Sequence, residues 1–207
     1  MSLALQADKR RKDDAYFTPD ACAEHCVGLL EPWSRVISGN ESIGRVLEPS
    51  CGDGAFTKAL FRAAPWAQHF AIDINEHDAH RNIAPFARFV QADYLQHFGV
   101  DPVFEAERYD VIAGNPPYTL AEPFVRRSLA WLREGGVLGM LLRLAFLESA
   151  KRVPFWREHP AAEVNVLAER PSFTKGGTDS AAYGFFIWQA GYKKPTRLNV
   201  TSWKGGK

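Results

Sequence analysis

From residue 43 onward the sequence alternates short apolar runs with longer segments of helical pattern, and this alternation constrains the fold more than any other feature. Runs such as Val111-Ile112-Ala113 are apolar at successive positions, which is typical of strands covered on both faces. The pattern predicts an α/β domain with a largely parallel sheet. The predicted strands are 43–47, 69–72, 88–90, 109–113 and 137–142, and the predicted helices are about 55–64, 76–83, 123–133 and 147–158.

The two ends of the chain differ from this pattern. Residues 163–167 and 182–189 predict two further strands with no helix between them, so we expect these strands to pair antiparallel. Thr18 and Pro19 predict the N-cap and first residue of a helix that runs to about Leu30. We expect a flexible basic arm over residues 1–14, a single domain over residues 15–191 and a basic tail over residues 192–207.

The composition gives little indication of a partner. The chain of 207 residues carries a net charge of +1, although its basic arm and tail suit contacts to phosphates. Its 3 cysteines contain no Cys-x-x-Cys pair, and we expect Cys22, His25 and Cys26 to form a packed helix face rather than a metal site. No segment approaches the roughly 20 apolar residues of a membrane span, and no apolar signal region begins the chain. We therefore expect a cytoplasmic protein with no metal and no membrane partner.

A glycine-containing loop, Glu48-Pro49-Ser50-Cys51-Gly52-Asp53-Gly54, follows the first predicted strand and precedes a helix. Ligands of open α/β sheets bind at the carboxyl ends of the strands, and glycines there let the backbone approach a ligand closely. The third glycine of the phosphate-binding pattern is absent, and Glu48 and Asp53 would repel a phosphate. The loop therefore predicts a site for a cationic or neutral ligand.

Acidic residues also end the next two predicted strands. Asp73 follows the second strand, where a carboxylate can accept both hydroxyls of a ribose. Asp93 follows the third strand, where a carboxylate can accept an adenine amino group. Either residue alone is more simply a helix cap or a loop acid. Together with the glycine loop, they predict a ligand of the adenosine type.

The segment Asn115-Pro116-Pro117-Tyr118 follows the fourth predicted strand. The two prolines make the turn rigid, Asn115 and the carbonyl of Pro116 provide acceptors, and Tyr118 provides an aromatic face. An aryl or amide amine is a poor nucleophile because its lone pair is delocalised. Two acceptors that hold its N–H groups favour a localised lone pair, and they stabilise the charge that develops during in-line attack on a sulfonium methyl group. A tyrosine can stack on a base flipped from a duplex.

These motifs resemble those of the amino-group DNA methyltransferases, which use S-adenosylmethionine. Residues Asp14-Ala15-Tyr16-Phe17-Thr18-Pro19 are similar to the N-terminal motif that closes over the methionine end of the cofactor in that family. The order of this motif, the glycine loop and Asn-Pro-Pro-Tyr is that of the gamma group. The resemblance covers roughly residues 13–189 and implies a Rossmann-like class I methyltransferase fold. Its sheet would be seven-stranded and mostly parallel, with an antiparallel final strand pair.

The resemblance also implies roles for single residues. Asn115 and the Pro116 carbonyl would bind the target amine, and Tyr118 would stack on the base. Residues 173–182 resemble, more loosely, a late loop of short phage-type adenine methyltransferases, which makes Phe173 or Tyr183 a candidate contact to the flipped base. The candidate catalytic residues are Asn115, Pro116, Pro117 and Tyr118. The candidate cofactor residues are Tyr16, Phe17, Thr18, Pro19, Glu48, Pro49, Ser50, Gly52, Gly54, Asp73, Ile74, Asp93, Tyr94 and Asn115. The candidate substrate residues are Tyr118, Phe173 and Tyr183.

The function implied by this resemblance is methylation of the N6 amine of adenine in DNA, in a bacterial or phage-infected cell. Related motifs serve methyltransferases that modify adenine or guanine in RNA, or a glutamine amide in protein, although the last usually carry an N-terminal helical domain. A non-catalytic binding subunit is a further alternative. Only a short tail follows the last predicted strand, so we expect no separate target-recognition domain. The sequence leaves open whether the protein is a monomer or a homodimer.

Overall fold

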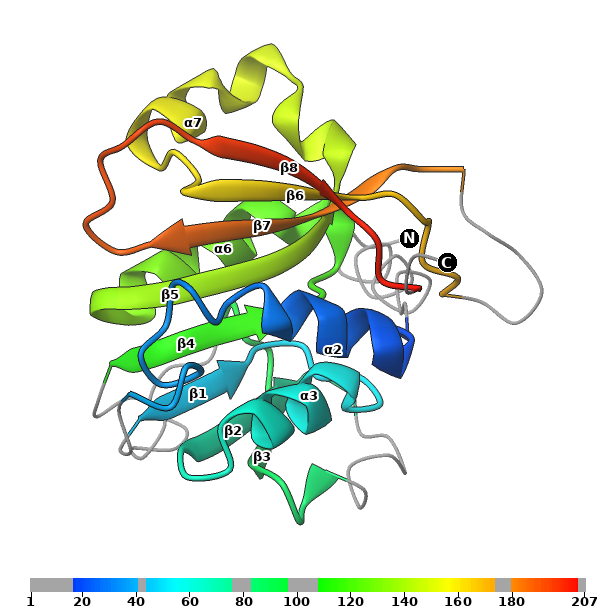
Figure 1. The fold of residues 1–207 in the computed structure, drawn as a ribbon, viewed down its shortest axis with the longest axis vertical. Helices are drawn as coiled ribbons and strands as arrows, with labels where there is room; N and C mark the ends of the chain where they lie inside the picture. The colour runs from blue at the N-terminus through cyan, green and yellow to red at the C-terminus, as the bar shows by residue number, and fades with distance from the viewer. Residues whose placement is uncertain (1–16, 41–43, 76–82, 97–107, 174–179, 205–207) are drawn as a thin grey trace, which may run out of the picture.

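Eight strands of the described residues form one mixed sheet, and helices cover both of its faces (Figure 1). The computed structural model describes residues 17–40, 44–75, 83–96, 108–173 and 180–204. The sheet order is β3-β2-β1-β4-β5-β7-β6-β8, and β7 alone among these strands runs antiparallel to its neighbours. The strands are β1 (Arg45–Glu48), β2 (Gln68–Asp73), β3 (Arg88–Gln91), β4 (Tyr109–Gly114), β5 (Leu132–Arg143), β6 (Glu163–Leu167), β7 (Tyr183–Gln189) and β8 (Arg197–Thr201).

The two larger apolar cores of the described residues lie on the two faces of this sheet. Helices α2 (Asp20–Gly28) and α3 (Ala55–Ala63) pack on one face, and α6 (Ala121–Trp131) packs on the other (Figure 1). This arrangement explains why the central strands are buried along their whole length. The shorter helical elements are η1 (Tyr118–Leu120), η2 (Leu144–Leu147), η3 (Ala150–Arg152) and α7 (Val153–Glu158).

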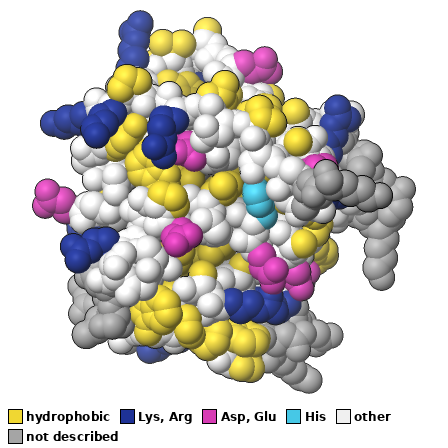
Figure 2. Space-filling model, viewed as in Figure 1, with side chains coloured by type: hydrophobic (Ala, Val, Ile, Leu, Met, Phe, Trp, Pro, Cys, Tyr) yellow, Lys and Arg dark blue, Asp and Glu magenta, His cyan; other side chains and the backbone are white. Residues whose placement is uncertain are grey.

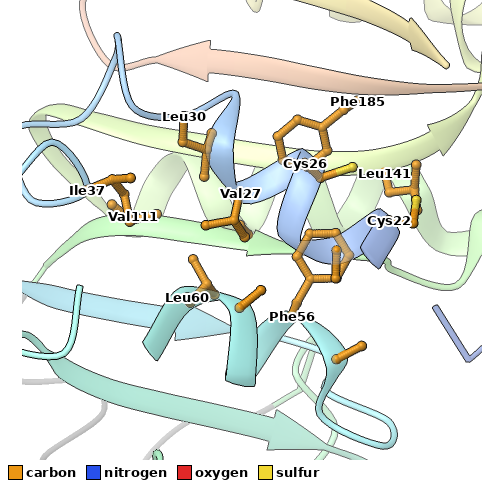
Figure 3. Packing of buried hydrophobic residues seen from close by; sticks show 14 of the residues in the cluster. Cys22, Cys26, Val27, Leu30, Ile37, Phe56, Leu60, Val111, Leu141 and Phe185 are labelled. Atoms are coloured by element: carbon orange, nitrogen blue, oxygen red, sulfur yellow. The ribbon is translucent and has the colours of Figure 1, made fainter. Parts of the chain in front are cut away.

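The apolar face of α2 carries two cysteines. Cys22 and Cys26 are 0% exposed, and Figure 3 shows them among the residues that pack between α2, α3 and the sheet. Both thiols are free, and burial raises the pKa of Cys26 well above its usual value. Phe56 of α3 stacks on Phe185 of β7 with ring centroids 6.2 Å apart. The prediction that the two cysteines belong to a packed helix face is therefore confirmed.

The sheet has one strand more than the seven that we predicted. The α/β fold, the mostly parallel sheet and the antiparallel pairing of β6 with β7 are confirmed. However, the segment expected to be a basic tail contains β8, which pairs in parallel with β6 from Glu163↔Arg197 to Leu167↔Thr201. An ion pair between Arg197 and Glu163 fixes this pairing. An exposed edge strand of this kind lacks the continuous apolar run that marks a buried strand.

The segment that we predicted as one helix over residues 147–158 consists of separate short elements instead. The 3-10 turns η2 and η3 come first, and the α-helix begins only at Val153. Ser149 lies between the two turns with a φ angle of 111°, which is outside the helical region. A continuous helix cannot pass through this residue. The prediction for this segment was therefore wrong in its first half.

The sheet order places the expected ligand-binding crevice at the carboxyl end of β1. The chain proceeds outward from β1 through β2 to β3, and then returns to the other side of β1 with β4 and β5. The order thus reverses at β1, which is the position where open α/β sheets bind ligands. All the candidate loops that follow β1, β2, β3 and β4 emerge at this edge.

Charges of both signs are spread over the molecular surface. Figure 2 shows Lys and Arg side chains together at the upper left, at the end of the molecule where α7 and the β7–β8 connection lie in Figure 1. Acidic side chains are visible on the same face, in keeping with the net charge of +1. Within the described residues, no helix has the length and apolar character needed to cross a membrane.

Candidate active site

The loop that follows β1 turns tightly because two of its glycines adopt left-handed conformations. Gly52 has a φ angle of 49° and Gly54 one of 84°. A Cβ atom on Gly54 would lie 2.6 Å from Cγ1 of Ile83, so no other residue fits there without movement. The Gly54 N–H donates to the carbonyl of Cys51 at 2.7 Å, and α3 begins at the next residue. The loop therefore exposes backbone at the crevice.

Asp73 ties this loop to the end of β2. Its Oδ2 accepts the N–H of Gly52 at 2.8 Å, and its Oδ1 accepts the N–H of Asn75 at 2.9 Å. The residue is 8% exposed. Because each carboxylate oxygen has about two acceptor positions, both oxygens retain capacity for a further donor. Asp73 thus positions the loop in addition to the ligand-binding role that the sequence suggests.

Glu48 is the most deeply buried acid of the crevice. It is 2% exposed, and the hydroxyl of Thr57 donates to its Oε2. Burial raises the pKa of Glu48 well above its usual value, and the nearby charges of Asp73 and Asp53 act in the same direction. Burial also raises the pKa of Asp53. A cationic ligand would relieve this repulsion, whereas an anionic ligand would increase it.

Hydrogen bonds from two other segments hold Asn115 at the end of β4. The Ser50 hydroxyl donates to the Asn115 carbonyl at 3.2 Å, which links the glycine loop to the Asn-Pro-Pro-Tyr segment. The Asn115 side-chain amide donates to the Thr18 hydroxyl at 3.1 Å. Its Oδ1 atom is buried and has no hydrogen-bond partner among the described residues. A buried acceptor left in this state is costly unless a ligand supplies a donor.

The bond between Thr18 and Asn115 corrects the predicted helix start. Pro19, not Thr18, occupies the N-cap position of α2, and no side chain caps this helix. The Thr18 side chain instead contacts a residue 97 positions later in the chain. The Thr18 side chain therefore contacts Asn115 instead of capping the helix, and its predicted cofactor contact stays a prediction.

The three candidate substrate residues form one aromatic cluster. The Tyr118 ring lies 5.5 Å from the Tyr183 ring and 6.2 Å from the Phe173 ring, measured between centroids. Phe173 and Tyr183 are 5.1 Å apart. Tyr183 is 0% exposed, whereas Tyr118 retains accessible surface. The structure therefore makes Tyr118 the accessible aromatic face and places Tyr183 behind it.

Two exposed apolar side chains flank the glycine loop. Phe17 is 44% exposed, and its ring lies 3.8 Å from the position that a Cβ on Gly52 would occupy. Ile74, which follows Asp73 directly, is 40% exposed. Both residues belong to the predicted cofactor set. Apolar side chains exposed beside a crevice are suited to cover an apolar or aromatic part of a ligand.

The remaining candidate residues differ in burial and in where their side chains lie. Asp93 is partly exposed and its Oδ1 caps the turn by accepting the N–H of Leu95 at 3.0 Å. The side chain of Tyr94 belongs to the core instead: it is 2% exposed, and its hydroxyl bonds to Ser128 of α6 at 2.9 Å. This side chain faces away from the crevice, which corrects its predicted cofactor role. Pro49 and Pro116 are buried. The Pro117 carbonyl accepts the N–H of Leu120 at 2.9 Å. Tyr16 lies outside the described residues.

Three further residues near the site, Thr57, Arg143 and Arg152, are not among the candidate site residues. Thr57 was missed because nothing in the sequence marks its contact with Glu48. Arg143 lies over the Tyr118 ring, with its guanidinium carbon 5.0 Å from the ring centroid. As a charge at the end of the fifth predicted strand, Arg143 could have been found by the reasoning applied to Asp73. Arg152 lines the same pocket as Arg143 and Tyr118.

The chain is similar in sequence and in fold to known methyltransferases. No protein-family model matches the chain. Over 118 residues, or 56% of its length, the chain is 33% identical to the type II methyltransferase M.TthHB8I of Thermus thermophilus. The chain spans about a quarter of the length of that relative, 24%.

Solved structures match most of the chain. A Listeria monocytogenes protein assigned to the class I S-adenosylmethionine-dependent methyltransferases superposes with a TM-score of 0.68 and 16% identity, over 91% of this chain and 66% of that one. This chain has the class I methyltransferase fold. A modification subunit assigned to a type I restriction enzyme of Vibrio vulnificus matches with a TM-score of 0.63 and 16% identity, over 87% of this chain and 45% of that one. Identities at this level support the fold alone, because one fold serves many reactions.

Proposed function

We propose that this chain transfers a methyl group from S-adenosylmethionine to the N6 amine of adenine in DNA. The observation that carries this proposal is the buried Oδ1 of Asn115, which has no donor among the described residues and lies in an Asn-Pro-Pro-Tyr turn at the carboxyl end of β4. No described residue donates to the adjacent Pro116 carbonyl either. Two neighbouring acceptors without donors suit a group that carries two N–H bonds.

The residues around the glycine loop fit the proposed cofactor. Asp73 retains acceptor capacity at the end of β2, where ribose hydroxyls bind in related folds. The exposed side chains of Phe17 and Ile74 would cover the less polar parts of the ligand. The buried acids Glu48 and Asp73 favour a cationic ligand over an anionic one at this position. S-adenosylmethionine would supply an electrophilic methyl group on such a cationic sulfur.

The chain's own residues would bind, orient and activate the amine. Asn115 Oδ1 and the Pro116 carbonyl would accept its two N–H groups, which localises the nitrogen lone pair. The same two oxygens would stabilise positive charge as it develops on the nitrogen. The Thr18 hydroxyl fixes the amide of Asn115, and Ser50 fixes its backbone, so both acceptors are preorganised. Tyr118 would stack on the base, with Tyr183 and Phe173 supporting it from behind.

DNA is the acceptor that we favour because the curated relative with 33% identity is a type II methyltransferase. Methyl transfer from labelled S-adenosylmethionine to duplex DNA, single-stranded DNA and total RNA, followed by mass spectrometry of the nucleosides, tests the proposal. N6-methyladenine in DNA is the expected product. Label in RNA alone would reject DNA as the substrate while preserving the amine chemistry, and label in none of the three would reject nucleic acid as the substrate.

Removal of the Thr18 hydroxyl tests whether this side chain orients Asn115. Thr18→Val is expected to lower kcat about fivefold, since a neutral hydrogen bond contributes about 1 kcal/mol. Thr18→Ser keeps the hydroxyl and is the matched control. Steady-state kinetics measures kcat, and calorimetry with the cofactor measures cofactor affinity separately. An equal loss in both variants, or an effect confined to cofactor affinity, would contradict an orienting role.

A further inference from the structure

A pocket of about 180 Å³ adjoins Tyr118 on the side of β5. It is lined by Tyr118 and Thr119 of η1, by Phe146 of η2, and by two arginines, Arg143 and Arg152. These residues come from four elements, η1, β5, η2 and η3, which the fold brings together at the carboxyl edge of the sheet. The proposed mechanism does not use either arginine.

Arg152 is held rigidly at this pocket. Its Nη1 donates to the carbonyl of Glu148 at 2.9 Å and to that of Ala145 at 3.2 Å. Its guanidinium carbon lies 5.0 Å from the centroid of the Phe146 ring. The described residues place no carboxylate against Arg152, and its Nε and Nη2 donate to none of them. A fixed positive charge with donors to spare therefore lines the pocket.

Arg143 connects the pocket to the aromatic cluster. Its guanidinium lies over the Tyr118 ring at 5.0 Å, and its Nε donates to the Tyr183 hydroxyl at 3.4 Å. Arg143 is the last residue of β5 and is half-buried. The guanidinium thus covers one face of the Tyr118 ring, and a ligand that contacts it lies beside this side chain.

We propose that Arg143 and Arg152 together bind a backbone phosphate of the nucleic-acid strand beside the methylated base. The proposal rests on the function proposed above and names how its substrate is held. A planar guanidinium donates in parallel to two oxygens of a phosphate, and two of them form a preorganised clamp. Because Arg152 is tied to two loop carbonyls, it cannot extend into a groove to read base edges. The clamp therefore positions the strand without specifying its sequence.

The surroundings of the pocket favour a polymer over a small free anion. Leu147 and Val153 follow the lining residues Phe146 and Arg152 directly in the chain, and they are 47% and 42% exposed. A free phosphate ion would leave these apolar side chains in water. An unstacked strand would cover them with sugar and base surface.

Fluorescence anisotropy with short labelled single-stranded and duplex DNA containing adenine tests this clamp. The affinity is measured over a range of salt concentrations for the wild-type chain and for Arg143→Gln, Arg152→Gln and Arg152→Lys. Arg157→Gln removes an equal charge from an exposed position of α7 and is the matched control. Cofactor affinity, measured by calorimetry, reports whether each variant keeps its fold.

Loss of the Arg152 contact is expected to weaken binding about tenfold to a hundredfold, as for a hydrogen bond to a charged group. The slope of log affinity against log salt should fall by about 0.7 for a single strand, which corresponds to one phosphate contact. Arg152→Lys should keep the wild-type slope but bind DNA more weakly, because lysine keeps the charge and lacks the planar donors. Arg157→Gln should keep the wild-type slope.

Two outcomes would overturn the clamp: the same slope for Arg152→Gln and Arg157→Gln, or no binding of nucleic acid by the wild-type chain. Methyl transfer measured on the same samples separates this inference from the proposed function. A chain that methylates DNA with an unchanged salt slope in Arg152→Gln would keep its function and lose the clamp. A chain that binds DNA through Arg152 without methylating it would keep the clamp and lose the function.

Discussion

Asn115→Ala is expected to lower the rate of methyl transfer by about a hundredfold to a thousandfold, the usual effect of removing one preorganised polar group from a transition state. The Oδ1 of Asn115 is buried and has no donor among the described residues, so it is available to the target amine. Affinity for S-adenosylmethionine should remain nearly unchanged, because the Ser50 hydroxyl of the glycine loop donates to the Asn115 backbone carbonyl, which the variant keeps. Single-turnover kinetics and calorimetry measure the two quantities separately.

Asn115→Asp provides the matched control for this variant. It keeps an acceptor oxygen at the same position but cannot donate to the Thr18 hydroxyl through an amide. We expect it to retain more activity than Asn115→Ala. If the alanine variant is folded and loses cofactor binding instead of the chemical step, the role assigned to Asn115 is wrong.

The sequence predicted the central part of the fold because local signals and the three-dimensional structure agree there. Strands β1, β2, β4 and β5 contain apolar runs that become buried between two layers of helices, so their pattern directly reports their environment, whereas β3 is only partly buried. The motifs at their carboxyl ends then lie together automatically, because parallel strands end at one edge. Asp73 and Asn115 reach the same crevice for this reason.

The errors arose where a distant contact decides the local structure. The strand β8 exists because Arg197 to Thr201 pair with β6, more than thirty positions earlier in the chain, and its exposed side chains give no apolar signal. Thr18 carries the sequence signature of an N-cap, yet its hydroxyl accepts from Asn115. Tyr94 follows an acidic site residue, but the aromatic environment of α6 draws its side chain into the core.

Asp73→Ala is expected to have the largest effect on cofactor affinity. The lost contacts to ribose hydroxyls should weaken binding about tenfold to a hundredfold for each hydrogen bond to the carboxylate. A second cause adds to this effect, because Asp73 also accepts the N–H groups of Gly52 and Asn75 and so holds the glycine loop. Calorimetric titration with S-adenosylmethionine measures the total loss. Asp53→Ala, which removes a half-buried acid of the same loop, is the matched control.

A cofactor analogue without the ribose 2′-hydroxyl separates the two causes. If Asp73 binds the ribose, the wild-type chain should prefer the complete cofactor, and Asp73→Ala should no longer distinguish it from the 2′-deoxy analogue. If Asp73 acts only through Gly52, the variant should bind both compounds more weakly and keep the same preference between them. The difference between the preferences of the wild type and of Asp73→Ala is a coupling free energy between one hydroxyl and one carboxylate. Distortion of the loop weakens the binding of both compounds equally, so it cancels from this difference. A coupling of zero would reject the ribose contact and leave Asp73 as the residue that positions the glycine loop.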